Sequence, residues 1–218
     1  MVIIMRKLKI YLDTSVISFY FAEDAPEKMA ITRKFFDREL VKGKYEIYLS
    51  ALTVQELSNC NDLALQEKLV KFANELTVHI LESTGEIEEI SQQFVDEGVI
   101  PAKYLDDAIH LTLAILNGMD YIVSWNFKHI VKPKTKKAVR AFCIKEGYKE
   151  TEIVTPEEVL FLSYEEPRVM RKLHEIRAKR YEETKHMTAE ERAKSTNEEA
   201  RKIAEKYGLK FNFVDKTH

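Results

Sequence analysis

The sequence has few cysteines, no long apolar run and no excess of basic residues. Its two cysteines, Cys60 and Cys143, are far apart and belong to no Cys-x-x-Cys pattern. This argues against a disulfide framework and a cysteine-based zinc site. No segment approaches the about 20 apolar residues that a transmembrane helix needs, and the apolar stretch before Arg6 is too short for a secretory signal. We therefore expect a cytoplasmic protein with reduced thiols and no membrane partner.

The balance of charge argues against a protein that binds duplex nucleic acid non-specifically. There are 34 Lys and Arg residues against 36 Asp and Glu residues, so the net charge is −2, which argues against non-specific binding of duplex nucleic acid. It leaves open an enzyme that holds phosphate groups through metal ions. With 218 residues, 45% of them hydrophobic, the chain is long enough for one α/β domain plus an extension.

Apolar segments typical of strands alternate with helical patterns through the first three quarters of the chain. The predicted strands are 8–12, 45–50, 77–81, 121–125 and 152–154. The predicted helices are 26–40, 52–59, 63–76, 83–94, 105–118, 134–147 and 156–160. For the helix at 83–94, Ser83 is the predicted N-cap of a capping box with Glu86. The alternation indicates an α/β fold, a three-layer α/β/α sandwich with a central parallel sheet of about five strands.

The pattern changes near residue 163. Beyond it the sequence is rich in charged residues, and two amphipathic helices are predicted: one from Val169 to Tyr181, and one from a capping box at Thr188 to Tyr207, ended by Gly208. Their apolar faces are too narrow to form a core, so we expect them to cover another surface. The predicted domains are residues 1–162 and a helical extension, 163–218.

Acidic residues and one amide fall at the expected strand ends. Asp13 ends the first strand in "KIYLDTSVISFYF" (9–21), where it is either a helix N-cap or part of a site at the carboxyl end of a parallel strand. Glu56 follows the second strand, Asp106 and Asp107 open the helix before the fourth, and Asn126 follows the fourth. Clustered carboxylates repel one another unless a cation lies between them, and such oxygen ligands suit Mg²⁺ or Mn²⁺.

Four segments in this order resemble the PIN-domain nucleases, most closely the VapC-like toxins of type II toxin–antitoxin systems. They are "YLDTSVIS", "SALTVQEL", "DDAIHLTLA" and "DYIVSWNFKHI", within residues 8 to about 162. The resemblance implies a metal-dependent endoribonuclease that hydrolyses RNA, leaving a 3′-hydroxyl and a 5′-phosphate. It implies Asp13, Glu56, Asp107 and Asn126 as catalytic residues, the three acids holding Mg²⁺ or Mn²⁺. The family often has Asp where this chain has Asn126, which leaves open whether one or two metal ions bind.

Five further residues are candidates for contacts with the substrate or with the metal ligands, each with a second interpretation. Thr14 and Ser15 either cap the first helix or hold a phosphate or a water molecule. Asp106 is the expected N-cap of its helix, and His110 is either a packed residue or a site residue. Lys128 begins the basic segment "KHIVKPKTKK" (128–137), which is either a solvated surface or a contact for RNA phosphates.

The resemblance also implies partners. VapC-like proteins are typically homodimers, and the apolar helices around Leu63, Leu69 and Phe72 are the expected interface. The segment after residue 163 resembles the antitoxin-like helices that are encoded beside such toxins, which implies an antitoxin in cis or as a separate chain.

Arg171, Arg177 and Arg180 of this segment are the expected inhibitory contacts with the acidic site, because an Arg fork pairs a carboxylate well. The alternative is a solvated helical extension that stabilises a dimer.

Other functions remain to be weighed against the nuclease. A phospho-receiver domain needs an acidic pair after the first strand and a Lys after the fifth, and the sequence provides neither. A haloacid-dehalogenase-type phosphatase needs a second acid two residues after Asp13, where Ser15 stands. The main alternative is a catalytically weak or inactive PIN-like protein with a binding or regulatory role, because Asn126 carries no charge.

Overall fold

The computed structural model describes residues 6–162 and 168–210, and the chain forms two compact units, Met1–Tyr164 and Glu165–His218. The N-terminal unit contains a five-stranded parallel sheet: β1 (Leu8–Leu12), β2 (Tyr45–Ser50), β3 (Val78–Leu81), β4 (Tyr121–Val123) and β5 (Glu152–Val154). The strand order is β3-β2-β1-β4-β5. All neighbouring strands pair in parallel. The predicted parallel sheet is confirmed.

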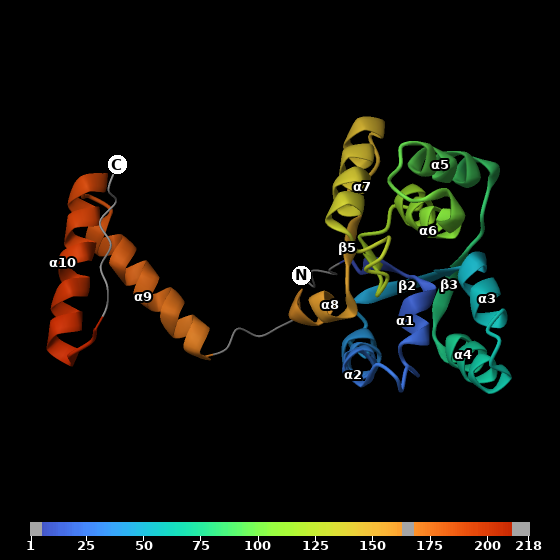
Figure 1. Cartoon of the computed structure of the whole chain (residues 1–218), viewed down its shortest axis with the longest axis horizontal. Coiled ribbons are helices and arrows are strands. Elements are labelled where there is room, and N and C mark those ends of the chain that lie inside the picture. The colour runs from blue at the N-terminus through green and yellow to red at the C-terminus, as the bar shows by residue number, and fades with distance from the viewer. Residues whose placement is uncertain (1–5, 163–167, 211–218) are drawn as a thin grey trace, which may run out of the picture. The chain divides into compact units, whose positions relative to one another are not determined.

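Helices cover both faces of this sheet (Figure 1). One face carries α1 (Thr14–Ser18), α2 (Pro26–Lys34), α3 (Ala51–Ser58), α4 (Leu63–Glu75) and α8 (Pro156–Leu162). The other face carries α5 (Gly85–Asp96), α6 (Leu105–Leu116) and α7 (Pro133–Glu146). The predicted three-layer α/β/α sandwich is therefore confirmed.

Strand β1 lies at the centre and supplies both layers of the core. Successive side chains of a strand point to opposite faces. Tyr11 accordingly packs among residues of α5, α6 and α7, whereas Ile10 and Leu12 pack among residues of α1, α3 and α4. Helix α6 is buried from Ala108 to Ile115, which explains why its sequence is almost entirely apolar after the first turn.

The direction of winding reverses beside β1. From β1 the chain moves outward through β2 to β3, then crosses back over the sheet to β4 and continues to β5. The carboxyl ends of β1 and β4 therefore flank the point at which the strand order reverses. In open α/β sheets, this is where ligand sites form.

Two helix starts differ from the prediction. The N-cap of α5 is Thr84, whose hydroxyl accepts from Ile87 N (3.4 Å), so the prediction of Ser83 is wrong by one residue. The Ser83 hydroxyl instead donates to Glu88. The N-cap of α6 is Tyr104, with no side-chain cap, so Asp106 is not the cap. At α5, Ser83 and Thr84 compete for one cap and the backbone dihedrals decide for Thr84, whereas α6 begins without a side-chain cap.

The predicted helix 26–40 also changes its character along its length. It is α-helical in α2, then forms a π-helical turn over Phe35–Glu39 and a short 3₁₀ turn over Leu40–Lys42. Phe35 and Phe36 are consecutive and both buried. A π-helical turn widens the helix locally, and here it accompanies the burial of both rings against the sheet.

The C-terminal unit contains α9 (Arg168–Thr184) and α10 (Ala189–Tyr207). The predicted capping box is present, with Thr188 and Glu191 bonded to each other's backbone N–H, and Gly208 ends α10 in a left-handed conformation. Among the described side chains of this unit only Ala204 is buried. The predicted boundary at 162–163 adjoins residues 163–167, which lie outside the described ranges. Neither unit, as far as it is described, contains a helix long and apolar enough to cross a membrane.

Candidate functional site

Asp13 is both a strand-end residue and a helix cap, so its two interpretations do not exclude each other. Its Oδ1 accepts from Ser15 N (2.7 Å) and from the Ser15 hydroxyl, and its Oδ2 accepts from the Ser124 hydroxyl (2.5 Å). Asp13 is 3% exposed. Burial raises its pKa, although His110, Ser124 and Ser15 act in the opposite direction. The surrounding structure therefore fixes both oxygens in one orientation.

Asp107 lies in the first turn of α6 and is the least compensated carboxylate of the cluster. Its Oδ1 accepts from Asn126 Nδ2 (2.9 Å), whereas its Oδ2 is buried and has no hydrogen-bond partner among the described residues. Burial raises the pKa of Asp107 to about 6; His110 lowers it, and Asp13, Glu56 and Asp106 raise it further. An oxygen in this position lacks a cation or a donor.

Asn126 connects the loop after β4 to Asp107. Its backbone N–H donates to the Ser124 hydroxyl (2.9 Å) and its Oδ1 accepts from His129 N (3.0 Å). Because Nδ2 donates to Asp107, both ends of the amide are engaged within the protein. Asn126 thus orients the carboxylate of Asp107.

The partly buried Glu56 forms a network with the buried residues His110 and Tyr11. His110 Nε2 lies 3.0 Å from Glu56 Oε2, and its Nδ1 lies 2.5 Å from the Tyr11 hydroxyl, which donates to Ser50 (2.8 Å). The Thr14 hydroxyl also donates to Glu56. Burial disfavours the charged imidazole, but Tyr11 and Glu56 outweigh it and raise the pKa of His110 well above its usual value.

The same pairing acts on the acid. Burial opposes the charged form of Glu56, but the hydrogen bond from His110 and the charge of His110, with Thr14, lower the pKa of Glu56. His110 is 3% exposed, so it is at once a packed residue and a residue of the site. His110 therefore contacts Glu56 and acts electrostatically on the carboxylates of Asp13 and Asp107.

The structure shows three site residues that the sequence analysis missed. They are Tyr11, Ser50 and Ser124, and all three are buried. Ser50 and Ser124 stand at the carboxyl ends of β2 and β4, the places where the acids were sought. Tyr11 is a polar group at the centre of the sheet, a position that requires a partner. Once the strands are known, the sequence itself shows the two hydroxyls at strand ends and the polar group of Tyr11 inside the sheet.

The remaining predicted residues lie at different distances from the carboxylates. Thr14 and Ser15 contact Glu56 and Asp13 directly. Asp106 is exposed, and it acts on the site only through its charge, which helps to raise the pKa of Asp107. Lys128 contacts Tyr104, not an acid, with its Nζ 3.0 Å from the phenol oxygen.

Two features of this cluster suit a divalent metal ion: the type of its donor atoms and one carboxylate oxygen without a hydrogen-bond partner among the described residues. The donors are carboxylates, which suit Mg²⁺ or Mn²⁺, and Asp107 Oδ2 has no partner in the described structure. Within residues 6–162 and 168–210, however, no three Asp, Glu, His or Cys side chains are arranged to hold a metal ion. Asp13 is bound by Ser15 and Ser124, and Glu56 is bound by His110.

The arginines that are expected to contact the site lie on α9. Arg171 and Arg177 are exposed. The guanidinium of Arg180 donates to the hydroxyl of Thr196 on α10, so part of its hydrogen-bonding capacity is used inside the C-terminal unit.

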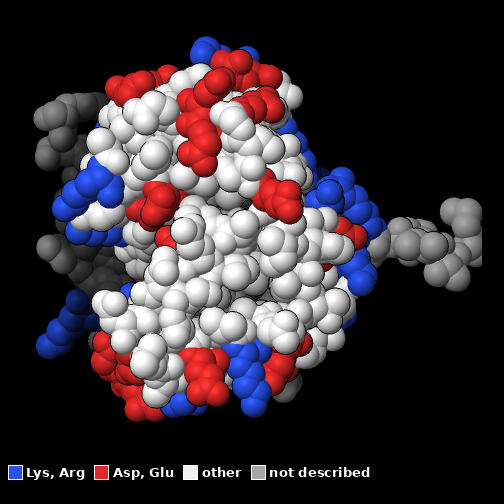
Figure 2. Space-filling view, turned by 90° about the vertical axis from the view of Figure 1, so that its right-hand side faces the viewer, with Lys and Arg blue, Asp and Glu red and all other residues white. Residues whose placement is uncertain are grey.

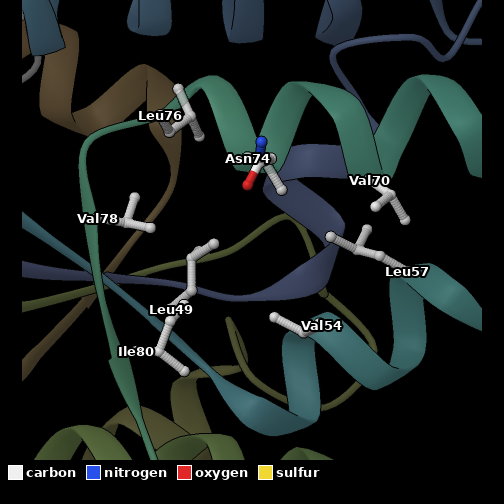
Figure 3. Close-up of a pocket in the computed structure, with 9 residues that line it drawn as sticks. Leu49, Val54, Leu57, Val70, Asn74, Leu76, Val78 and Ile80 are labelled. Carbon is white, nitrogen blue, oxygen red and sulfur yellow. The ribbon is translucent and has the colours of Figure 1, made fainter.

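A separate apolar pocket lies between α3, α4 and the edge strand β3 (Figure 3). Its volume is about 360 Å³, and Asn74 is its one polar lining residue among Leu49, Val54, Leu57, Val70, Ala73, Asn74, Leu76, Val78 and Ile80. The side of the unit that carries α3, α4 and β3 shows a broad area without charge (Figure 2). Of the predicted dimer residues, Leu69 is 3% exposed and belongs to the core, which corrects that part of the prediction, whereas Leu63 is exposed.

Comparison with known proteins identifies the fold of the N-terminal unit. The family model of the PIN domain matches residues 10–133, more than half of the chain. No curated protein matches the chain. A similar solved structure is that of VapBC2 from Rickettsia felis bound to a DNA fragment from their promoter, with 12% identity and a TM-score of 0.43 over 68% of this chain and 98% of that one. On the strength of the family match, this chain belongs to the PIN-domain family.

Proposed function

We propose that the protein is a divalent-metal-dependent endoribonuclease of the VapC-like toxin type, with its active site at Asp13, Glu56, Asp107 and Asn126. PIN domains are generally nucleases, so membership of the family supports phosphodiester hydrolysis. One observation carries the proposal: the buried, unpartnered Oδ2 of Asp107 close to two further carboxylates. A structure retains such a group against its cost in stability when the group has a function.

Each residue has a defined part in this reaction. Asp13, Glu56 and Asp107 would hold Mg²⁺ or Mn²⁺, which when bound makes water a stronger nucleophile and offsets the charge on the phosphoryl oxygens. Ser15 and Ser124 hold Asp13 in place, and Asn126 holds Asp107. The attacking water forms a new P–O bond, the bond to the 3′-oxygen breaks, and the products are a 3′-hydroxyl and a 5′-phosphate.

The test compares two neighbouring acids. Asp107→Asn removes the charge of the uncompensated carboxylate without changing its shape. Asp106→Asn makes the same change on an exposed neighbour and is the matched control. Cleavage of single-stranded and structured RNA is measured with Mg²⁺, Mn²⁺ or EDTA. We expect Asp107→Asn to reduce cleavage by more than the about 10- to 100-fold typical of residues that only support a metal ligand, and Asp106→Asn to change it little. Full activity in EDTA or in Asp107→Asn contradicts the proposal.

A PIN-like binding protein without turnover is the second candidate, and the Glu56–His110 pair favours it. His110 occupies one oxygen of a proposed metal ligand, and Asn126 adds no charge. The two candidates differ in metal binding, which thermal unfolding measures. Under the nuclease proposal, Mg²⁺ or Mn²⁺ raises Tm, and Asp13→Ala abolishes the rise. No shift with either metal, together with no cleavage, favours the binding protein.

We further propose that residues 165–218 act as an antitoxin-like inhibitor of the nuclease, within one chain or in a dimer partner. Helix α9 exposes Ile176 and Tyr181 beside the cations Arg171 and Arg177. A tethered segment reaches an effective concentration in the millimolar range, so weak contacts suffice for inhibition.

The inhibition is tested in the full chain. Arg171→Glu combined with Arg177→Glu is expected to increase RNA cleavage, and Lys194→Glu combined with Lys202→Glu on α10 is the control with the same change of charge. A chain that ends at Tyr164 is expected to be more active, and more toxic on expression, than the full chain. Unchanged activity and toxicity in a folded shortened chain exclude an inhibitory role.

The proposed setting is a cytoplasmic homodimer that acts on RNA. The exposed apolar side chains Val54, Val70 and Ile80 around the pocket support an interface between copies at this surface. Light scattering across a wide range of concentrations tests this assembly. A monomer at every concentration contradicts it.

A further inference from the structure

A pair of aromatic rings lies beside the acidic cluster, where the turn before α6 meets the loop after β4. Tyr104 ends a short 3₁₀ turn, Ala102–Tyr104. Its ring lies against that of His129, with 4.0 Å between centroids and 33° between planes. His129 is 6% exposed, and neither of its ring nitrogens has a hydrogen-bond partner in the part of the chain that is described. The buried imidazole therefore packs against the ring of the partly exposed Tyr104.

Two lysines, Lys103 and Lys128, contact the Tyr104 ring, and a third, Lys132, acts on His129 through its charge. Lys128 Nζ lies 3.0 Å from the Tyr104 hydroxyl and 5.1 Å from its ring centroid, and Lys103 Nζ lies 4.8 Å from the same centroid. The hydrogen bond from Lys128, with Lys103 beside it, lowers the pKa of the Tyr104 phenol. Burial lowers the pKa of His129, and Lys132, Lys128 and Lys103 lower it further. Lys103 and Lys128 therefore act on both rings.

The charge of these lysines is not neutralised by acids. Several other lysines of the N-terminal unit form ion pairs, as Lys136 does with Glu158 and Lys149 with Asp120. Lys103, Lys128 and Lys132 form none with the acidic side chains of residues 6–162 and 168–210. In a chain with a net charge of −2, these three lysines form a local concentration of positive charge that attracts anions.

Hydrogen bonds connect this basic cluster to the acidic site. Tyr104 precedes Asp107 by three residues, about one helical turn. On the other side, His129 N donates to Asn126 Oδ1 and Asn126 Nδ2 donates to Asp107 Oδ1, at 3.0 and 2.9 Å. A strand that passes over Asp107 therefore reaches the lysines with its neighbouring phosphate groups.

We propose that Lys103, Lys128 and Lys132, arranged around Tyr104, bind backbone phosphate groups of single-stranded RNA next to the position at which it is cut. This site rests on the proposed nuclease function and defines how the substrate is held. The lysines supply the charge, and the Tyr104 hydroxyl positions Lys128 and offers its own proton to a phosphate oxygen. Contacts of this kind position a strand without reading its sequence.

Binding of a fluorescein-labelled single-stranded RNA to the full chain, measured by fluorescence anisotropy in EDTA at several salt concentrations, tests the site. The triple variant Lys103→Gln, Lys128→Gln and Lys132→Gln is expected to bind at least tenfold more weakly. The slope of log K against log salt is expected to become shallower by about 2, because each lost phosphate contact contributes about 0.7. Tyr104→Phe is expected to cost about two- to tenfold, the value of one hydrogen bond.

The control triple variant changes Lys44, Lys68 and Lys71 to Gln, which removes the same charge from exposed lysines elsewhere on the unit. Equal affinity and equal slope in both triple variants overturn the phosphate site, as does a wild-type chain that binds no RNA. If inorganic phosphate binds at these lysines but all variants bind RNA equally well, the site is also overturned, because it then holds free phosphate and not the RNA backbone. Because EDTA prevents metal-dependent cleavage, binding and cleavage are measured separately. If the lysines bind RNA but the chain does not cleave it with Mg²⁺ or Mn²⁺, the nuclease proposal is refuted. If the chain cleaves RNA but the lysine variants bind it as the wild type does, only this site is refuted.

Discussion

Charged side chains are buried in the N-terminal unit, where Asp13 and His110 are each 3% exposed, and lie in solvent on α9 of the C-terminal unit. There the side chains of the Lys179–Glu183 ion pair are 79% and 60% exposed. An exposed pair of this kind contributes about 0–1 kcal/mol. A buried cluster is costly unless every group has a partner, and Asp107 Oδ2 has none among the described residues. The comparison shows where the chain accepts an energetic cost, and it does so at the proposed active site.

Apolar side chains differ between the units in the same way. The N-terminal unit buries large aliphatic side chains such as Leu111 and Leu113 completely, whereas the C-terminal unit leaves Ile176, Tyr181 and Ile203 more than half exposed. The hydrophobic core of the N-terminal unit therefore stabilises that unit by itself. The C-terminal unit buries only Ala204 among its described side chains, so its stability depends on helix propensity or on a surface that covers it.

The largest expected effect is the difference in the free energy of unfolding between truncating an aliphatic residue in the N-terminal unit and truncating one in the C-terminal unit. Leu113→Ala is expected to lower the free energy of unfolding by about 2–5 kcal/mol, because it leaves a cavity beside Ile87 and Ile109. Ile176→Ala is expected to change it by less than about 0.5 kcal/mol, the value typical of surface positions. Urea unfolding followed by circular dichroism measures both. A large loss from Ile176→Ala breaks the comparison and shows that α9 is covered by another surface in solution.

The next effect concerns buried polar groups. Tyr11→Phe removes the hydroxyl that lies between His110 and Ser50, and it is expected to cost about 1–3 kcal/mol because two buried groups lose a partner. Tyr181→Phe makes the same change on an exposed ring and is the matched control, with no expected loss. Thermal unfolding of both variants provides the measurement. Equal Tm values for the two variants would show that the buried network contributes no stability.

The smallest effect compares two capping boxes. Thr155 caps α8 with Glu158, and Thr188 caps α10 with Glu191. Replacement of Thr155 by Ala is expected to cost about 1 kcal/mol and to lower Tm by about 2–4 °C. The same change at Thr188 is expected to speed amide hydrogen exchange in the first turn of α10 and to leave the main transition in place. If Thr188→Ala lowers the main transition equally, the two units unfold together.

Much of the fold could be predicted from the sequence because its signals are local. Five apolar runs gave the strands, and turn residues such as Gly147 and Gly208 marked helix ends, both in left-handed conformations in the structure. Prediction failed where two local options were nearly equal. Ser83 and Thr84 both suit an N-cap, and only the backbone dihedrals at the start of α5 decide for Thr84. The π-helical turn at Phe35–Glu39 likewise depends on how two adjacent rings are buried.

The site was predictable in part for the same reason. The topology of a parallel sheet predicts that residues next to strand ends share one edge, as it does for Asp13, Glu56, Asp107 and Asn126. The structure brings Asn126 into contact with Asp107. Their roles in catalysis remain predictions. The pairing of Glu56 with His110 and the position of Tyr11 between His110 and Ser50 had no local signal, because each joins residues that are far apart in the sequence. The basic segment 128–137 could be read from the sequence, but the contact of Lys128 with Tyr104 could not.

By itself the sequence determined the order of strands and helices, the parallel sheet and the residues that stand at its carboxyl edge, because hydrophobic periodicity and caps act over a few residues. Only the tertiary structure decided which oxygens are satisfied: Asp13 is bound by two hydroxyls, Glu56 by an imidazole, and Asp107 Oδ2 by no described group. Partners of buried polar groups come from distant elements, and their pKa values depend on distances and burial that exist only after the chain has folded.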